Sequence, residues 1–186
     1  MMSWKGERPT MRQLAGELQE KFFREVSDDI ALVVSSDTAN KAYLSGYVSM
    51  AHDLAPSYRS AALVSRDRTS LVVSAADAGP ASEFLRKAGQ IHRYGEFYFE
   101  TVEDWPRDFL KPARSDFTVA FKEAINAVRP TDGLIGVDRT NDDLLWDLCR
   151  EILGEHRIAD VTRCLGAARA TKSPGEIARL REATRL

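Results

Sequence analysis

A short apolar run, Ile30 to Val34, limits what this chain can fold into more than any other segment of the sequence. All of its residues are apolar, most are β-branched, and polar residues flank it on both sides. Such a run is typical of a strand buried on both faces, because a strand with one solvent-exposed face alternates apolar and polar residues. We therefore expect Ile30 to Val34 to be a central strand of a sheet.

The residues after this strand are polar and suited to a turn. Between Thr38 and Tyr43 the chain carries side chains that hydrogen-bond to nearby backbone, so a turn or a single helical turn is expected. From Leu44 to Tyr47 the chain is expected to extend again, with Gly46 allowing a close backbone approach that a Cβ would block.

The segment before the strand has the pattern of an amphipathic helix. Thr10 followed by Gln13 matches a capping box. The apolar residues behind this cap fall on one helical stripe, which consists of Met11, Leu14, Leu18 and Phe22. A helix is therefore expected from residue 11 to about residue 25.

Strand and helix patterns alternate in the rest of the chain. An exposed loop of mixed polarity, 48–59, is expected to precede an antiparallel hairpin of Ser60 to Ser65 and Ser70 to Ala75. Further strands are expected at 91–94, 97–102, 134–137 and 158–161, and helices at 78–88, 117–128 and 141–153, with Asp77 and Thr140 as N-caps and Gly89 and Gly154 at helix ends. This order predicts an α/β fold, a mixed sheet with helices on both faces.

Length and charge exclude several classes of protein. The 186 residues suffice for one domain with an apolar core, and 26 basic against 28 acidic residues, without a basic block, disfavour a nucleic-acid partner. No apolar run approaches the roughly 20 residues of a membrane helix, and the first residues lack the apolar segment of a signal peptide. A cytoplasmic protein without a membrane partner is expected. Cys149 and Cys164 are then expected as free thiols, although their spacing also allows a disulfide.

The sequence contains none of several common catalytic motifs. It has no His-Glu-x-x-His, Cys-x-x-Cys, Gly-x-Gly-x-x-Gly or Gly-x-Ser-x-Gly segment. Its three histidines, His52, His92 and His156, lie far apart and beside no carboxylate cluster, so they are expected to be surface or half-buried imidazoles.

Two segments far apart in the sequence form a pair of motifs. The first consists of Asp29, Leu32, Val34, Asn40, Tyr43, Leu44, Ser45, Gly46 and Tyr47, and the second of Arg169, Lys172, Ser173, Glu176 and Ile177. Together they resemble the amino-terminal domain of the creatinase/prolidase (pita-bread) family of metallohydrolases. The resemblance implies a ribonuclease-H-like mixed sheet over residues 1–170. It also implies that residues 171–186 are a linker and the first helix of a truncated catalytic domain, for which Ser173-Pro174-Gly175-Glu176 is a strong helix start. The alternative is a terminal helix that packs on the same domain.

The resemblance also implies a function. The chain would be the non-catalytic amino-terminal domain of a cytoplasmic, metal-dependent C–N hydrolase, most simply an Xaa-Pro dipeptidase or aminopeptidase, and would contribute to dimerisation and substrate access. The two divalent ions of that family (Mn, Co or Zn) belong to the catalytic domain, so no metal ligand is expected here and this chain alone is expected to be inactive. Two alternatives stay open: a creatinase-like amidinohydrolase acting on small molecules, and a non-enzymatic binding or assembly module of the same fold.

One loop is expected to carry functional residues. In several members of the family this loop reaches the active site of the neighbouring subunit, and an arginine just before the second strand contacts the substrate carboxylate. Arg59 occupies the matching position, and a guanidinium binds a carboxylate bidentately without losing its charge. Tyr58 and His52 are weaker candidates in the same loop, and the alternative for Arg59 is a solvated charge. The expected partners are a second copy of the protein, the missing catalytic domain, and a peptide or small-molecule substrate.

Overall fold

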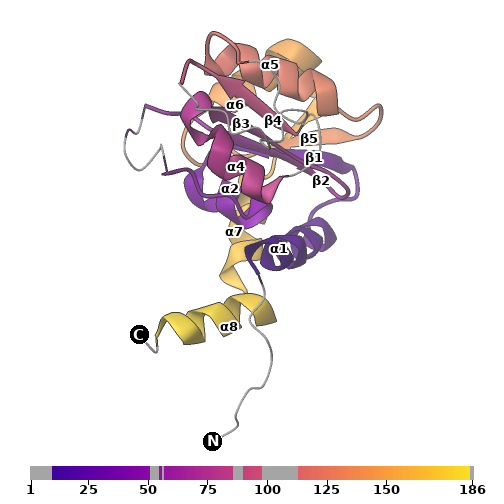
Figure 1. The fold of residues 1–186 in the computed structure, drawn as a ribbon. Helices are drawn as coiled ribbons and strands as arrows, with labels where there is room; N and C mark the ends of the chain where they lie inside the picture. Colours follow the sequence, from indigo (N-terminus) through magenta and orange to yellow (C-terminus); the bar gives the residue numbers. More distant parts are fainter. Residues whose placement is uncertain (1–9, 51–54, 56, 86–89, 98–112, 185–186) are drawn as a thin grey trace, which may run out of the picture.

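Six strands form a single sheet that is covered by helices on both faces (Figure 1). The computed structural model describes residues 10–50, 55, 57–85, 90–97 and 113–184. The strands are β1 (Ile30–Ser35), β2 (Ala61–Ser65), β3 (Thr69–Ser74), β4 (Ile91–Tyr94), β5 (Leu134–Val137) and β6 (Ile158–Asp160). The helices are α1 (Met11–Glu25), α2 (Thr38–Ser45), η1 (Ala75–Asp77), α4 (Ala78–Phe84), α5 (Phe117–Val128), α6 (Leu144–Leu153), η3 (Glu155–Arg157), α7 (Thr162–Ala170) and α8 (Pro174–Ala183).

The sheet is mixed, and β2 is the strand that runs against the others. The strand order is β4-β3-β2-β1-β5-β6. Strand β1 pairs in parallel with β5, β5 with β6, and β3 with β4, whereas β2 is antiparallel to both β1 and β3. The expected central position of β1 and the expected hairpin of β2 and β3 are confirmed.

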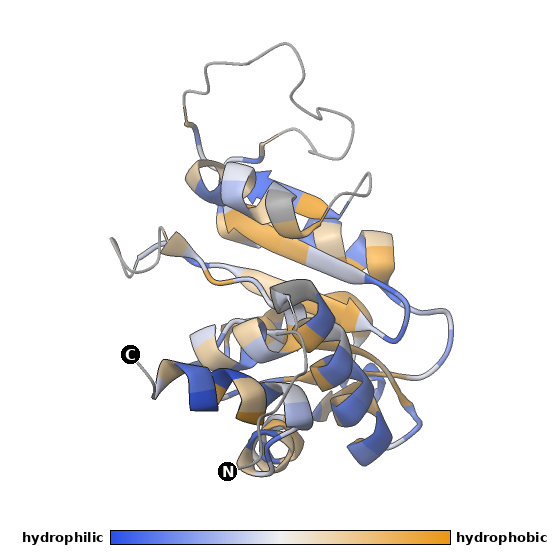
Figure 2. Cartoon of the chain, turned by 60° about the horizontal axis from the view of Figure 1, so that its bottom comes forward, coloured by the Kyte–Doolittle hydropathy of each residue, from blue (hydrophilic) through white to orange (hydrophobic). Residues whose placement is uncertain are grey.

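The apolar core consists of two layers, one on each face of the sheet. Helices α1, α2, α4 and α7 cover one face and helices α5 and α6 cover the other. Strand β1 supplies both layers, because Ile30 and Val33 pack in the first while Leu32 and Val34 pack in the second. In Figure 2 the strands are mainly orange between helices that also carry blue residues, as expected for a sheet buried on both sides.

Helix α1 begins where the capping-box pattern predicts. The Thr10 hydroxyl accepts from the backbone N–H of Gln13 at 3.2 Å, and the Gln13 side chain accepts from the backbone N–H of Thr10 at 2.7 Å. Leu14, Leu18 and Phe22 are buried as expected. The expected ranges of α5 and β5 are likewise confirmed.

Helix α2 is longer than expected, and the prediction that the chain extends again from Leu44 is wrong. The Asp37 carboxylate caps the helix by accepting from the Asn40 backbone N–H at 2.8 Å. The helix then continues through Ser45 and ends at Gly46, whose φ of 74° is the left-handed conformation that terminates many helices. Gly46 therefore serves as a helix cap.

Two further N-caps differ from expectation. Helix α6 begins at Leu144, and its N-cap residue is Asp143, which makes no capping hydrogen bond with its side chain. Asp142 accepts from the Leu144 backbone N–H at 3.0 Å, and the Thr140 side chain binds Asp138. Asp77 stands at the cap position of α4 but makes no capping hydrogen bond, since its carboxylate accepts from the Ser49 hydroxyl.

Part of the prediction lies on undescribed residues, and one helix was missed. The expected strand after Phe97 and the end of the expected helix at Gly89 lie outside the described residues. Ser49, in the loop expected to be exposed, is buried, whereas Val48 and Met50 are exposed. Helix α7 was not expected.

Helix α8 projects beyond α1, away from the sheet (Figure 1). Its capping box is present as expected, with the Ser173 hydroxyl and the Glu176 carboxylate each accepting from the other's backbone N–H. Its first turn contacts α1, where the Gly175 N–H donates to Glu17 at 3.2 Å. Further along the helix, Ile177 and Leu180 are 38% and 53% exposed.

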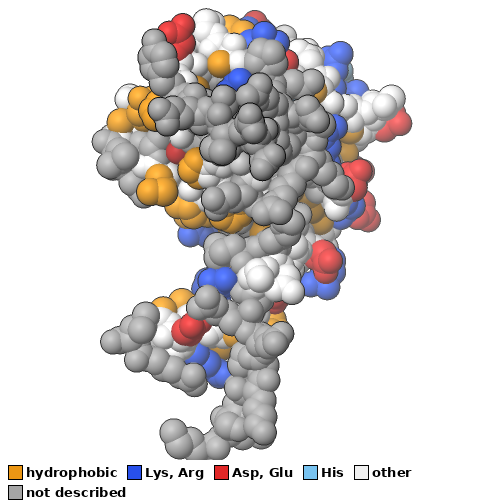
Figure 3. All heavy atoms as spheres, in the orientation of Figure 1, with side chains coloured by type: hydrophobic (Ala, Val, Ile, Leu, Met, Phe, Trp, Pro, Cys, Tyr) orange, Lys and Arg blue, Asp and Glu red, His pale blue; other side chains and the backbone are white. Residues whose placement is uncertain are grey.

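Positive and negative side chains are mixed on one face of the described part of the molecule. On the face drawn in Figure 3, Lys and Arg are interspersed with Asp and Glu and do not form one large patch. Within the described residues, no helix is long and apolar enough to cross a membrane.

Candidate functional site

The candidate site lies at the edge of the sheet where the parallel strands end. Strands β1, β3, β4, β5 and β6 all have their carboxyl ends at this edge, and β2 starts there because it runs the other way. Polar residues end or follow these strands, namely Ser35, Ser74, Tyr94, Asp138 and Asp160, with Ser60 before β2. Ligands of open α/β sheets commonly bind at this kind of edge.

Arg59 reaches this edge because it directly precedes β2. Its Nη1 donates to Asp142 Oδ2 at 2.6 Å, and its backbone carbonyl accepts from the Tyr94 hydroxyl at 2.8 Å. The side chains of Arg59 and Asp142 are 48% and 36% exposed. The guanidinium is therefore held in place yet accessible to a ligand.

A polar pocket adjoins Arg59. Its volume is about 180 Å³, and its lining residues come from three connections at the same edge, namely Ser36, Ser57, Tyr58, Arg59, Ser60, Asn141 and Asp142. The hydroxyl, amide, guanidinium and carboxylate groups of these residues can form hydrogen bonds with a ligand. The pocket suits a small charged or polar group better than a large apolar ligand.

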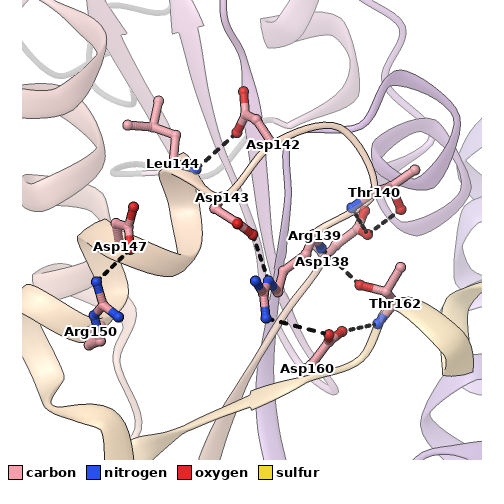
Figure 4. Close-up of polar contacts among 10 residues, drawn as sticks. All are labelled: Asp138, Arg139, Thr140, Asp142, Asp143, Leu144, Asp147, Arg150, Asp160 and Thr162. Carbon is pink, nitrogen blue, oxygen red and sulfur yellow. Dashed lines mark hydrogen bonds and ion pairs between the residues drawn. The ribbon is translucent and has the colours of Figure 1, made fainter.

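The loop that carries Asp142 is fixed by ionic contacts of its neighbours (Figure 4). Arg139 donates to Asp143 at 2.6 Å, and its guanidinium lies 4.7 Å from the centre of the Trp146 ring. The hydrogen bond from Arg139 lowers the pKa of the Asp143 carboxyl below its usual value. Asp160 lies 4.0 Å from Arg139 and accepts from the Thr162 backbone N–H at 2.8 Å, so the loop is also tied to the start of α7.

The two segments that carry the family resemblance meet in a buried polar network beside the pocket. Asp138 is 2% exposed and accepts from Ser35 at 2.6 Å, from Asn40 at 2.9 Å and from Thr140 at 2.5 Å. The amide oxygen of Asn40 accepts from Arg169 Nη1 at 2.9 Å. Residues 129 positions apart are thus joined, and these motif residues connect α7 to α2 and β5.

A second buried polar group lies at the same edge. Lys41 is 1% exposed and donates to the Ser60 hydroxyl. Sequence reasoning missed Lys41, because nothing in the local pattern marks a lysine on a helix face that turns inward.

Tyr47 is another buried polar residue. Burial raises the pKa of its phenol above the usual value, and the nearby Asp77 carboxylate adds to this shift.

The structure brings together two of the three residues expected in the functional loop. Arg59 and Tyr58 line the same pocket, and Tyr58 is 41% exposed. His52 lies outside the described residues. Of the other histidines, His92 is buried in β4, contrary to expectation, and His156 is in η3. Within the described segments, no three His, Cys, Asp or Glu residues are grouped to hold a metal ion, and both cysteines are free.

Known structures with a similar fold include several peptidases. A proline dipeptidase from Streptococcus pneumoniae matches with a TM-score of 0.56 and 17% identity, covering 84% of this chain and 98% of that one. A domain of a dipeptidase from Streptococcus thermophilus, described as belonging to the Creatine_N superfamily, matches with a TM-score of 0.52 and 16% identity over 86% of this chain and 98% of that one. This chain has the creatinase amino-terminal fold.

The creatinase amino-terminal fold also occurs as part of longer proteins. The Xaa-Pro dipeptidase of Bacillus anthracis matches with a TM-score of 0.58 and 12% identity over 90% of this chain but 39% of its own length. The amino-terminal domain of a FACT complex subunit from Cicer arietinum matches with a TM-score of 0.51 and 17% identity, covering 90% of this chain and 40% of that one. No protein-family model and no curated protein matches the sequence. At these identities the similarity establishes the fold.

Proposed function

We propose that this chain is the non-catalytic amino-terminal domain of a cytoplasmic, metal-dependent C–N hydrolase, most simply an Xaa-Pro dipeptidase or aminopeptidase. The observation that carries the proposal is the accessible Arg59 in a polar pocket, on a fold shared with dipeptidases. In this proposal the protein is a homodimer, and the guanidinium binds the substrate carboxylate at the active site of the neighbouring subunit. A creatinase-like activity on a small carboxylate would use Arg59 in the same way.

The chemistry of this chain would be binding and positioning. A guanidinium presents two parallel N–H groups to a carboxylate, which fixes the orientation of the substrate as well as its position. The Arg59 backbone is held by Tyr94, and the Arg59 side chain is held by Asp142. The two divalent ions (Mn, Co or Zn) that activate water in such hydrolases would be held by a second domain. The described part of this chain offers no fitting set of ligands, so no catalytic step through metal is assigned to it.

The proposed division of the chain places residues 1–170 in the amino-terminal domain and residues 171–186 in a linker and the first helix of the catalytic domain. Its support is the poor burial of α8. The helix contacts α1 through Gly175, while Ile177 and Leu180 on its apolar stripe are 38% and 53% exposed.

A non-enzymatic assembly module is the second candidate, and its support is the similarity to the FACT complex subunit. The coding sequence beyond residue 186 separates the two candidates. Two Asp, one His and two Glu in the pattern of a two-metal site would favour the hydrolase, and their loss would favour the assembly module.

Replacing Arg59 in the full-length protein tests the proposed role. Arg59→Ala should lower kcat/KM for an Xaa-Pro dipeptide by a factor equivalent to about 2–4 kcal/mol, the cost of truncating one partner of a desolvated charge pair. Arg59→Lys should recover part of the loss, because an ammonium keeps the charge but not the bidentate geometry. The free energy of unfolding should change by less than about 1 kcal/mol, since the ion pair with Asp142 is exposed.

Arg150→Ala is the matched control, since Arg150 is 52% exposed and also pairs with a single aspartate. Its kinetics should equal those of the wild type. The 186-residue chain alone, supplied with Mn, Co or Zn, should not cleave the dipeptide. Wild-type kinetics in the Arg59→Ala dimer would leave Arg59 as a surface charge and remove the proposed substrate contact.

A further inference from the structure

We propose that Asp142 is a built-in competitor for the carboxylate that binds Arg59. It would occupy the guanidinium in the free protein and would have to yield when a ligand carboxylate enters the pocket. The inference rests on the proposed carboxylate-binding role of Arg59 and adds to it a residue that sets how tightly that site binds.

The contact has the geometry of an occupied carboxylate site. Asp142 Oδ2 lies 2.6 Å from Arg59 Nη1, and both residues line the same pocket. The carboxylate of Asp142 is the same chemical group as that of the expected ligand. A ligand that binds in a bidentate manner needs two N–H groups of the guanidinium. It must therefore take the place of Asp142 or share Arg59 with a like charge.

Asp142 can release Arg59 at low cost. Its other oxygen, Oδ1, accepts from the Leu144 backbone N–H at 3.0 Å, so the residue keeps a partner at the start of α6 after the ion pair opens. The ion pair itself lies at the surface, with the two side chains 48% and 36% exposed. Exposed pairs of this kind contribute little to stability.

A nearby aspartate, Asp147, provides an internal comparison. It carries the same charge in the first turn of α6, but it pairs with Arg150 at 2.7 Å (Figure 4). Removing either negative charge changes the net charge of the molecule equally. A difference between the two substitutions therefore reports direct competition at Arg59 and not the overall field of the protein.

The consequence is a fixed penalty on carboxylate ligands. A carboxylate that binds Arg59 must either replace the contact with Asp142 or share the guanidinium with that like charge. The free-energy penalty equals the contribution of one exposed ion pair to stability. It corresponds to roughly a two- to fivefold loss of affinity for the carboxylate ligand. A neutral amide in the pocket would not meet this competition.

The test is a titration of the 186-residue chain with N-acetylproline, in which binding is monitored through the NMR signals of the isotope-labelled backbone. Asp142→Asn should bind N-acetylproline about two- to fivefold more tightly than the wild type. Asparagine keeps the oxygen that accepts from the Leu144 N–H, and it forms such bonds to the backbone two residues on as aspartate does, so the start of α6 should be preserved. The amide of N-acetylproline should bind neither protein measurably.

Asp147→Asn is the matched control and should bind N-acetylproline with wild-type affinity. Arg59→Ala added to Asp142→Asn should abolish the gain. Equal affinities of the wild type and Asp142→Asn, or no binding by either, would overturn the competitor role of Asp142, and the kinetics of Arg59→Ala in the full-length protein would still decide the role of Arg59. Tight binding of N-acetylproline by a variant that lacks Arg59 would overturn both the competitor role of Asp142 and the carboxylate-binding role of Arg59.

Discussion

Asn40 is the residue through which distant parts of this chain are joined. Its amide nitrogen donates to Asp138 at 2.9 Å and to Thr140 at 3.0 Å, while its amide oxygen accepts from Arg169. A planar amide can serve a carboxylate and a guanidinium at the same time because it has both donors and an acceptor. Asn40 thus lies between the buried Asp138 carboxylate and the Arg169 guanidinium and forms a hydrogen bond with each.

Asn40→Ala should destabilise the fold by about 1–3 kcal/mol. The substitution leaves a buried carboxylate with one donor fewer and removes the acceptor of Arg169, and the penalty for unpaired buried polar groups has this size. Asn40 is 3% exposed, so water cannot easily replace the lost contacts. Urea unfolding, monitored by circular dichroism, measures the change in the free energy of unfolding.

Asn126→Ala is the control for this substitution. Asn126 is exposed on α5, and its amide donates to the Lys122 carbonyl of its own helix. The free energy of unfolding should change by less than about 0.5 kcal/mol. Equal effects of the two substitutions would show that the network around Asp138 does not stabilise the fold.

Sequence reasoning identified the residues of this network but not their contacts. Asn40 and Arg169 stood out as motif residues, and Arg59 as the residue before a strand. Hydrogen bonds across 98 and 83 positions leave no local pattern, so neither Asp138 nor Asp142 could be named as a partner. Residues far apart in the sequence become hydrogen-bond partners only through the order of the strands, which is established when the chain folds.

The helices that were misjudged are those with short apolar stripes. Helix α7 buries only Leu165 and Ala168 and carries Gly166 in its middle, so its pattern falls below what periodicity detects. Helix α2 has a polar sequence and owes its second turn to its caps, Asp37 and Gly46. In contrast, α1 and α5 have full apolar stripes and were predicted almost to the residue.

The two glycines in these helices should respond oppositely to the same substitution. Gly46→Ala should destabilise the protein by about 1–2 kcal/mol, because its φ of 74° is unfavourable for a residue with a Cβ. Gly166→Ala should stabilise it by about 0.5–1 kcal/mol, since alanine favours helix interiors and a Cβ there meets no atom within 4 Å.

Chemical unfolding of both variants against the wild type measures these differences. A gain of stability in Gly46→Ala would contradict the left-handed end of α2. A loss in Gly166→Ala would mean that the exposed face of α7 is covered in solution.

At the scale of the whole molecule, burial of weak acids links stability to alkaline pH. Burial raises the pKa of the Cys149 thiol from 9.0 to about 12. Burial, with a contribution from Glu176, raises the pKa of Tyr43 from 10.0 to about 12. Each group holds its proton more tightly in the folded chain than in the unfolded one, so its contribution is complete below the unfolded pKa and is lost as pH rises toward the folded pKa.

The free energy of unfolding should therefore fall as pH rises from 9 toward 12. Thermal unfolding at a series of pH values measures the slope. Cys149→Ala removes the thiol and should reduce the slope between pH 9 and 10, where the unfolded thiol titrates first. A free energy that stays constant over the whole interval would contradict the burial of these groups.

The class of the fold followed from the sequence, but the order of its strands did not. Alternating strand and helix patterns predicted a mixed sheet covered on both faces, and the short turn between β2 and β3 predicted their antiparallel pairing. The antiparallel pairing of β1 with β2 was not predicted, because the residues between Gly46 and Ser60 have no periodic pattern. That pairing is what brings Arg59 to the edge where the other strands end.

The central place of β1 has a consequence for the chain while it is being synthesised. Strands β2, β3 and β4 follow β1 in the sequence and can pair beside it early, but its other neighbour, β5, begins only at Leu134. Until the ribosome has delivered that segment, β1 is an apolar strand with an unprotected edge, open to pairing with another chain. The strand at the centre of the finished sheet is therefore prone to aggregation in the nascent chain.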